Sequence, residues 1–99
     1  MVKNLENGCK RLHAIVSGRV QRVGFRYFVM NTAVQLALSG WVKNKWDGNV
    51  EVLAEGSQEK LDDLLQALHQ GPPSAIVESV EVEWSQAEGK FHRFHVKFS

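Results

Sequence analysis

The sequence predicts an α+β fold whose elements follow in the order β-α-β-β-α-β, with a short strand at the end of the chain. Three observations predict it. In some segments apolar side chains alternate with polar ones, as in a half-buried strand; in others they recur at three- and four-residue spacing, as in an amphipathic helix. Turn-forming residues separate these segments. The 99 residues fit one domain, and the single cysteine cannot form an intramolecular disulfide.

The first strand is predicted over residues 11–17, because every second side chain there is apolar. The apolar positions are Leu12, Ala14 and Val16. Residues 1–10 are polar and show no period, so we expect a flexible extension there and a folded domain over residues 11–99.

A helix is predicted from Phe25 onward, after a loop over residues 18–24 that holds two glycines. Its apolar face consists of Phe25, Phe28, Val29, Leu36 and Ala37. We expect Ser39-Gly40 to end it, because glycine adopts the left-handed conformation of a helix C-terminus without steric cost.

A hairpin and a second helix are predicted next. Two short alternating runs, residues 41–45 and 50–55, flank Asp47-Gly48, a pair that favours a tight turn. Ser57 is expected to cap a helix that ends at Gly71-Pro72-Pro73. Its apolar stripe consists of Leu61, Leu64, Leu65 and Leu68.

Two further strands complete the predicted order. Their apolar positions alternate with charged ones and are Ile76, Val80, Val82 and Trp84 in one, and Phe94, Val96 and Phe98 in the other. Two helices of this length can cover one face of an antiparallel sheet. The sequence therefore predicts a ferredoxin-like sandwich with a short extra C-terminal strand.

The charge pattern argues against a nucleic-acid binder. Lys and Arg number 12, Asp and Glu number 11, and the two signs alternate along most of the chain, whereas a dedicated binder clusters its cations. No apolar run is long enough to span a membrane, and the first residues lack the apolar centre of a signal peptide. We therefore expect a cytoplasmic protein. We also expect it to act as a monomer, although no sequence pattern determines its oligomeric state.

The segment that carries chemistry is GRVQRVGFR, residues 18–26, where the first strand meets the first helix. Such a junction leaves backbone N–H groups without helical partners, and the positive end of the helix dipole lies there. Arg26 could direct its guanidinium at the same anion. An anion site and an ordinary glycine turn with a surface arginine both fit the residues. The spacing matches neither a nucleotide P-loop nor a dinucleotide fingerprint, which favours a small phosphate.

GRVQRVGFR followed by SGWVKNKWDGNVEV closely resembles the two signatures of the acylphosphatase family, and the similarity extends over residues 12–98. The resemblance implies an enzyme that hydrolyses small acyl phosphates to a carboxylate and inorganic phosphate, without a metal or other cofactor. It implies that Arg26 binds the phosphoryl group and that Asn44 orients the attacking water. The loop amides would be those of Gln21, Arg22, Val23, Gly24, Phe25 and Arg26. Inorganic phosphate would be product and competitive inhibitor.

Arg22 stands where the family usually has glycine, and two outcomes are open. If the position needs a positive φ, arginine is strained there by about 1–2 kcal/mol and the anion cradle could open. If φ is negative, Arg22 adds a second cation near the phosphate. The sequence favours a weakened but recognisable active site.

Other residues receive structural interpretations. His92 and His95 are three apart on a strand and so point to opposite faces, which argues against a shared metal. Cys9 has no histidine arranged beside it for nucleophilic catalysis. Glu51 and Glu55 are interpreted as solvent-face residues. The three tryptophans, Trp41, Trp46 and Trp84, are expected to pack in the core.

Two alternative functions remain open on the same fold. An RNA-binding module shares the order of elements, and RVGFRYFV, residues 22–29, partly matches its aromatic signature. Its signature, however, occupies a strand, whereas this segment is predicted to open a helix. The other alternative is a protein that binds phosphate without catalysis. Phosphate would raise the melting temperature of such a protein, and the protein would not hydrolyse acyl phosphates.

Overall fold

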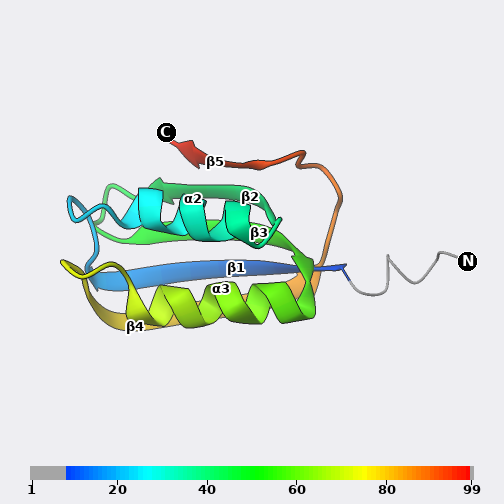
Figure 1. Ribbon diagram of the computed structural model, residues 1–99. Helices are drawn as coiled ribbons and strands as arrows, with labels where there is room; N and C mark the ends of the chain where they lie inside the picture. Colours follow the sequence, from blue (N-terminus) through cyan, green and yellow to red (C-terminus); the bar gives the residue numbers. More distant parts are fainter. Residues whose placement is uncertain (1–8, 99) are drawn as a thin grey trace, which may run out of the picture.

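The computed structural model describes residues 9–98, which form a mixed sheet with two helices on one face (Figure 1). The elements are β1 (Cys9–Arg19), α2 (Phe25–Gln35), β2 (Ser39–Asn44), β3 (Val50–Ser57), α3 (Gln58–Gln70), β4 (Ile76–Gln86) and β5 (Phe94–Lys97). The sheet is 5-stranded, in the order β4-β1-β3-β2-β5. The predicted α+β, ferredoxin-like arrangement is confirmed.

The sheet is antiparallel except at one edge. β1 pairs antiparallel with β3 and β4, and β2 pairs antiparallel with β3, but β5 lies parallel to β2. The predicted antiparallel sheet is therefore confirmed for β1 to β4, and the extra C-terminal strand, for which the sequence predicted no direction, is parallel to its neighbour. After β4 the chain passes around the end of the sheet without forming a helix (Figure 1). It then forms β5 at the opposite edge of the sheet, beside β2 and in the same direction as β2.

β1 is longer than predicted. It begins at Cys9, which pairs with Ser57, and Lys10 pairs with Gln86 on the other side. The extension predicted for residues 1–10 is thus wrong for its last two residues, because Cys9 pairs with β3 and Lys10 pairs with both β3 and β4. Residues 1–8 lie outside the described residues.

A bulge in β4 changes which side chains face the core. The register moves from Ser17 opposite Ser79 to Gly18 opposite Val77, so Glu78 is an extra residue in β4. Val77 therefore packs against the core, whereas Ile76 is 58% exposed, contrary to prediction. A Cβ on Gly18 would collide with the carbonyl oxygen of Ile76, so only glycine fits this close approach.

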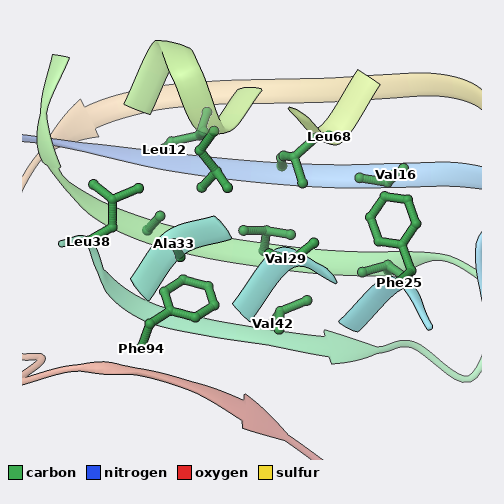
Figure 2. Close-up of a cluster of buried hydrophobic side chains, with 14 of the residues drawn as sticks. Leu12, Val16, Phe25, Val29, Ala33, Leu38, Val42, Leu68 and Phe94 are labelled. Carbon is green, nitrogen blue, oxygen red and sulfur yellow. The ribbon is translucent and has the colours of Figure 1, made fainter. Parts of the chain in front are cut away.

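The core lies between the sheet and the two helices (Figure 2). It is formed by alternate residues of the inner strands and by one face of each helix. The predicted face of α2 is wrong at Ala37, which is exposed after the end of the helix, whereas Ala33 is buried. Its largest fully buried side chains are Phe25, Leu12, Leu61, Leu64, Leu68, Val16, Val20, Val29, Val42, Val50 and Val52. Ser57 caps α3 by accepting a hydrogen bond from the Lys60 amide, 3.3 Å away. Val20 and Phe25, at the two ends of the loop between β1 and α2, are buried in this core.

α2 ends earlier than Ser39-Gly40, the predicted stop. Ala37 takes the left-handed conformation, with φ 59°, and its amide donates to Val34. The amide of Leu38 donates to Ala33 at 2.9 Å, which completes a Schellman motif without glycine. Leu38 is buried, and this burial favours the early turn. Ser39 and Gly40 are consequently free to join β2.

The tryptophans are not core residues. Trp46 is 98% exposed on the β2–β3 turn, and Trp84 is 42% exposed near the end of β4. Trp41 is half-buried on the sheet face that the helices leave uncovered, where the Lys97 ammonium lies 4.6 Å from the centre of its ring. The prediction that they pack in the core is wrong. No helix of residues 9–98 covers the sheet face that holds Trp41, and Trp46 lies on a turn. Trp84 lies opposite Leu12 on the helix-covered face, but near the end of the edge strand β4.

Glu55 is buried rather than solvent-facing, and it anchors the connection between β4 and β5. Its carboxylate accepts hydrogen bonds from Arg11 Nε at 2.8 Å, from the Glu88 amide at 2.9 Å and from the Gly89 amide at 3.0 Å. Burial by itself would raise the pKa of Glu55. The hydrogen bonds from Glu88, Arg11 and Gly89, together with the Arg11 charge, outweigh burial and lower that pKa below its ordinary value of 4.5.

Replacing Glu55 by Gln is expected to lower the free energy of unfolding by about 2 kcal/mol at about pH 7, because three donors lose a charged acceptor. A carboxyl whose pKa is lowered on folding stabilises the fold above its ordinary pKa. That stabilisation is lost as the pH falls through the folded pKa. The difference between wild type and Glu55→Gln should therefore shrink at about pH 3.

Urea unfolding at both pH values measures this difference. Glu83→Gln, which changes an exposed glutamate of β4 in the same way, should leave the stability unchanged. A difference between wild type and Glu55→Gln that does not vary with pH would show that the carboxylate is not what holds the connection.

Candidate functional site

The loop between β1 and α2 leaves a run of backbone amides without protein acceptors. Gly24 is the N-cap of α2, with φ 79°, and no side chain of the described residues caps the helix. The first backbone bond into the helix runs from the Phe28 amide to the Gly24 carbonyl, at 3.0 Å. Within residues 9–98, none of the amides of residues 21–27 donates to a protein acceptor. They are available to an anion at the positive end of the helix dipole.

Arg22 has a positive φ of 63°, so the first of the two outcomes predicted for it applies. The left-handed conformation strains a non-glycine residue by about 1 kcal/mol. The loop nevertheless keeps its bend, because Val20 and Phe25 at its two ends are each only 1% exposed. Burial of these two side chains outweighs the strain at Arg22.

A pocket of about 130 Å³ lies between this loop and the end of β2. It is lined by Val20, Arg22, Gly24, Phe25, Arg26, Tyr27 and Asn44. The fold therefore brings together Arg26 and Asn44, which are far apart in the sequence. Gln21 and Val23, also predicted for the site, do not line the pocket. Gln21 turns its side chain to the neighbouring loop, and Val23 packs against the core.

Asn44 is the last residue of β2, where pairing with Val50 fixes its backbone. Its side-chain oxygen Oδ1 is buried and accepts no hydrogen bond from any residue between 9 and 98. A buried acceptor without a donor costs about 1–3 kcal/mol, so native proteins rarely keep one without a function. Asn44 thus offers the pocket an unused acceptor.

The Gln21 side chain connects the two loops of the site. Its Nε2 donates to the carbonyl of Lys45 at 2.6 Å and to that of Asn49 at 2.8 Å. These residues begin and end the β2–β3 turn, directly after Asn44. Sequence reasoning included Gln21 only for its amide. The partners of its side chain are main-chain carbonyls, which leave no pattern in the sequence.

Arg26 is half-buried in the first turn of α2, and its guanidinium carbon lies 5.0 Å from the centre of the Phe98 ring. A cation stacked on an aromatic ring keeps its in-plane donors free for a ligand. No carboxylate lines the pocket, and neither Arg22 nor Arg26 forms an ion pair within the described part of the chain. The pocket is therefore positively charged.

A second hollow of about 460 Å³ adjoins the pocket and shares Asn44 with it. It is lined by Gln21, Lys43, Asn44, Lys45, Trp46, Glu51 and Phe98. Both of its lysines have acidic neighbours: Lys43 Nζ lies 3.9 Å from Glu51, and Lys45 Nζ lies 3.8 Å from Asp47. The charge of this hollow is accordingly more balanced than that of the pocket.

Cys9 and the histidines lie outside this site. Cys9 begins β1, and the loop follows the other end of that strand, about 33 Å away at the usual rise per residue. His13 Nε2 contacts Glu51 at 2.7 Å on the uncovered sheet face. Over residues 9–98, no group of His, Cys, Asp and Glu side chains is large enough to hold a metal ion. None of the described helices could span a membrane.

The segment that partly matches an RNA-binding signature, residues 22–29, lies in the loop and in α2 rather than on a strand. Its Phe25 is buried, and Phe28 packs against the core. In an RNA-recognition module the signature aromatics stack on bases from the open face of the sheet. The structure therefore contradicts an RNA-binding role for this segment.

Comparison with known proteins agrees with the geometry. The Acylphosphatase family model matches residues 12–96. An acylphosphatase of Thermus thermophilus is 51% identical over 86 residues, which cover 87% of this chain and 97% of the relative. One of Salinibacter ruber is 47% identical over 88 residues, 89% of this chain and 93% of the relative.

Among solved structures, an acylphosphatase from Coxiella burnetii superimposes with a TM-score of 0.90 at 38% identity. The match covers 98% of this chain and 100% of the other. The family model covers most of the sequence, and these relatives are matched over nearly their whole length. The chain therefore belongs to the acylphosphatase family.

Proposed function

We propose that the pocket between the loop and β2 hydrolyses the carboxyl–phosphate bond of small acyl phosphates, releasing a carboxylate and inorganic phosphate. The observation that carries the proposal is the unused hydrogen-bonding capacity of this pocket. It combines the amides of residues 21–27 with the buried Oδ1 of Asn44, and none of these groups has a hydrogen-bond partner among residues 9–98. Donors on one side and a single acceptor on the other suit a phosphoryl group with a water beside it.

The donors of the pocket would bind the phosphoryl oxygens. The amides and the guanidinium of Arg26 would surround the group and stabilise the charge that its oxygens carry in the transition state. Stacking on Phe98 would keep the guanidinium in place. At about 130 Å³ the pocket can hold a phosphoryl group but has no room for a nucleoside.

Asn44 would orient the attacking water. Its Oδ1 would accept a hydrogen bond from the water and so direct an oxygen lone pair at phosphorus. The leaving group is a carboxylate, which is stable without protonation, so no strong general acid is needed. Among residues 9–98, neither a carboxylate nor a histidine lines the pocket. We therefore assign the proton of the water to a phosphoryl oxygen of the substrate.

Inhibition by phosphate, oligomeric state and location are further properties that the sequence predicts. Inorganic phosphate would bind as product and competitive inhibitor, because it presents the same oxygens as the substrate. Action as a monomer and a cytoplasmic location stay predictions. A phosphate binder without catalysis is the alternative, and turnover of an acyl phosphate would exclude it.

Substitution of Arg26 and of Asn44 should affect different kinetic constants. Arg26→Ala should lower kcat/KM for benzoyl phosphate by about 1000-fold and abolish inhibition by inorganic phosphate, because it removes the charged donor. Asn44→Ala should lower kcat by about 100-fold with little change in the phosphate inhibition constant, because Asn44 is assigned to the attacking water and not to the phosphoryl group. Steady-state hydrolysis measures both.

Asn31→Ala, the same change on an exposed face of α2, serves as the control and should have no effect. If Asn44→Ala kept its full kcat, Asn44 would not orient the water. If wild type hydrolysed no acyl phosphate yet bound phosphate, the non-catalytic alternative would replace the proposal.

Gln21→Met should lower kcat/KM by about 10-fold and the free energy of unfolding by about 1–2 kcal/mol, because two carbonyls each lose one of their two donors and the loops are no longer joined. Most of the kinetic loss should appear in kcat, since Gln21 acts by positioning Asn44 against the loop. Gln66→Met, an exposed glutamine of α3, is the matched control. Loss of stability with unchanged kcat would limit Gln21 to a structural role.

A further inference from the structure

We propose that Arg22 makes this enzyme prefer acyl phosphates whose acyl group carries a second negative charge. The inference rests on the proposed function and adds a substrate class to it. It starts from the mouth of the pocket. The lining residues Val20 and Phe25 are buried and form its floor, whereas Arg22, Gly24 and Tyr27 are exposed.

The acyl group must extend toward this exposed side. The pocket holds little more than the phosphoryl group, so the rest of the substrate has to project outward. In-line displacement also places the leaving carboxylate opposite the attacking water. The water is assigned to Asn44, and every other lining residue belongs to the loop or to the first turn of α2. The leaving group therefore extends toward Arg22 and Tyr27.

Arg22 is the cation that remains available there. Arg26 stacks on Phe98 and is assigned to the phosphoryl oxygens. Lys43 and Lys45 have carboxylates within 4 Å, at Glu51 and Asp47. Arg22 lines the pocket and has no ion-pair partner within residues 9–98. An exposed guanidinium without a partner can bind a carboxylate or a second phosphate through two parallel hydrogen bonds.

The strained backbone conformation of Arg22 supports a functional role for its side chain. Its φ of 63° is one that glycine would adopt without strain, and the neighbouring Gly24 does so in the same loop. Strained backbone conformations of this kind cluster at functional sites. Because the loop keeps its bend with arginine present, Arg22 adds charge at the mouth without opening the amide cradle.

The test uses two substrates of nearly equal length. Succinyl phosphate ends in a carboxylate, whereas butyryl phosphate ends in a methyl group. In wild type the ratio of their kcat/KM values should favour succinyl phosphate, and Arg22→Asn should reduce this ratio by about fivefold. Asparagine tolerates the left-handed backbone, so the charge is removed without added strain. Arg22→Lys should keep part of the preference.

Two controls locate the effect. Arg19→Asn removes an exposed arginine that does not line the pocket and should leave the ratio unchanged. Lys45→Met removes a cation of the neighbouring hollow and should also leave it unchanged. A ratio that responds to Lys45→Met and not to Arg22→Asn would overturn the proposal by moving the acyl group to that hollow.

Failure of the inference is distinguishable from failure of the proposed function. If Arg22→Asn changed kcat/KM for both substrates equally, Arg22 would act on the phosphoryl group or the loop, and the proposal would be wrong while the hydrolase remained. If wild type hydrolysed neither substrate, the proposed function itself would fall.

Discussion

The site depends on one constraint, the sharp bend that the chain makes between β1 and α2. Val20 and Phe25 are buried on either side of it, and between them Arg22 and Gly24 take left-handed conformations. The bend cannot satisfy the amides of residues 21–27 internally. Their unused donors, rather than any reactive side chain, give the pocket its affinity for a phosphoryl group. The core thus determines the chemistry of the site, because the burial of Val20 and Phe25 determines which backbone amides remain available to a ligand.

The rest of the fold brings two partners to this bend. Pairing of β2 with β3 places Asn44 at its side, and the Gln21 side chain holds the two loops together. β5 returns along β2 and carries the chain to Phe98, the ring beneath Arg26. At the opposite end of the sheet, Glu55 holds the connection from which β5 starts. The carboxylate of Glu55, although remote from the pocket, therefore contributes to the placement of Arg26.

Sequence reasoning predicted the order of elements and both helices, because periodicity and glycine placement are local signals. Of the residues that it assigned to the site, Arg22, Gly24, Phe25, Arg26 and Asn44 line the pocket, whereas Gln21 and Val23 do not. Sequence reasoning failed where a neighbour decides the outcome. Ile76 turned outward because of a bulge set by Gly18, and α2 stopped at Ala37 because Leu38 is buried. The sequence pattern predicts a surface position for Glu55, because two of the donors to its carboxylate lie in the distant β4–β5 connection. The parallel course of β5 likewise follows from sheet topology, which no local pattern encodes.

The most direct measurement of the central claim is a titration of the ¹⁵N-labelled protein with inorganic phosphate, followed by amide NMR. If the bend binds the phosphoryl group through its main chain, the amides of residues 21–27 should shift together to lower field and saturate with one dissociation constant. That constant should equal the inhibition constant of phosphate against acyl phosphate hydrolysis. Phosphate that inhibits hydrolysis while these amides stay unshifted would contradict the account.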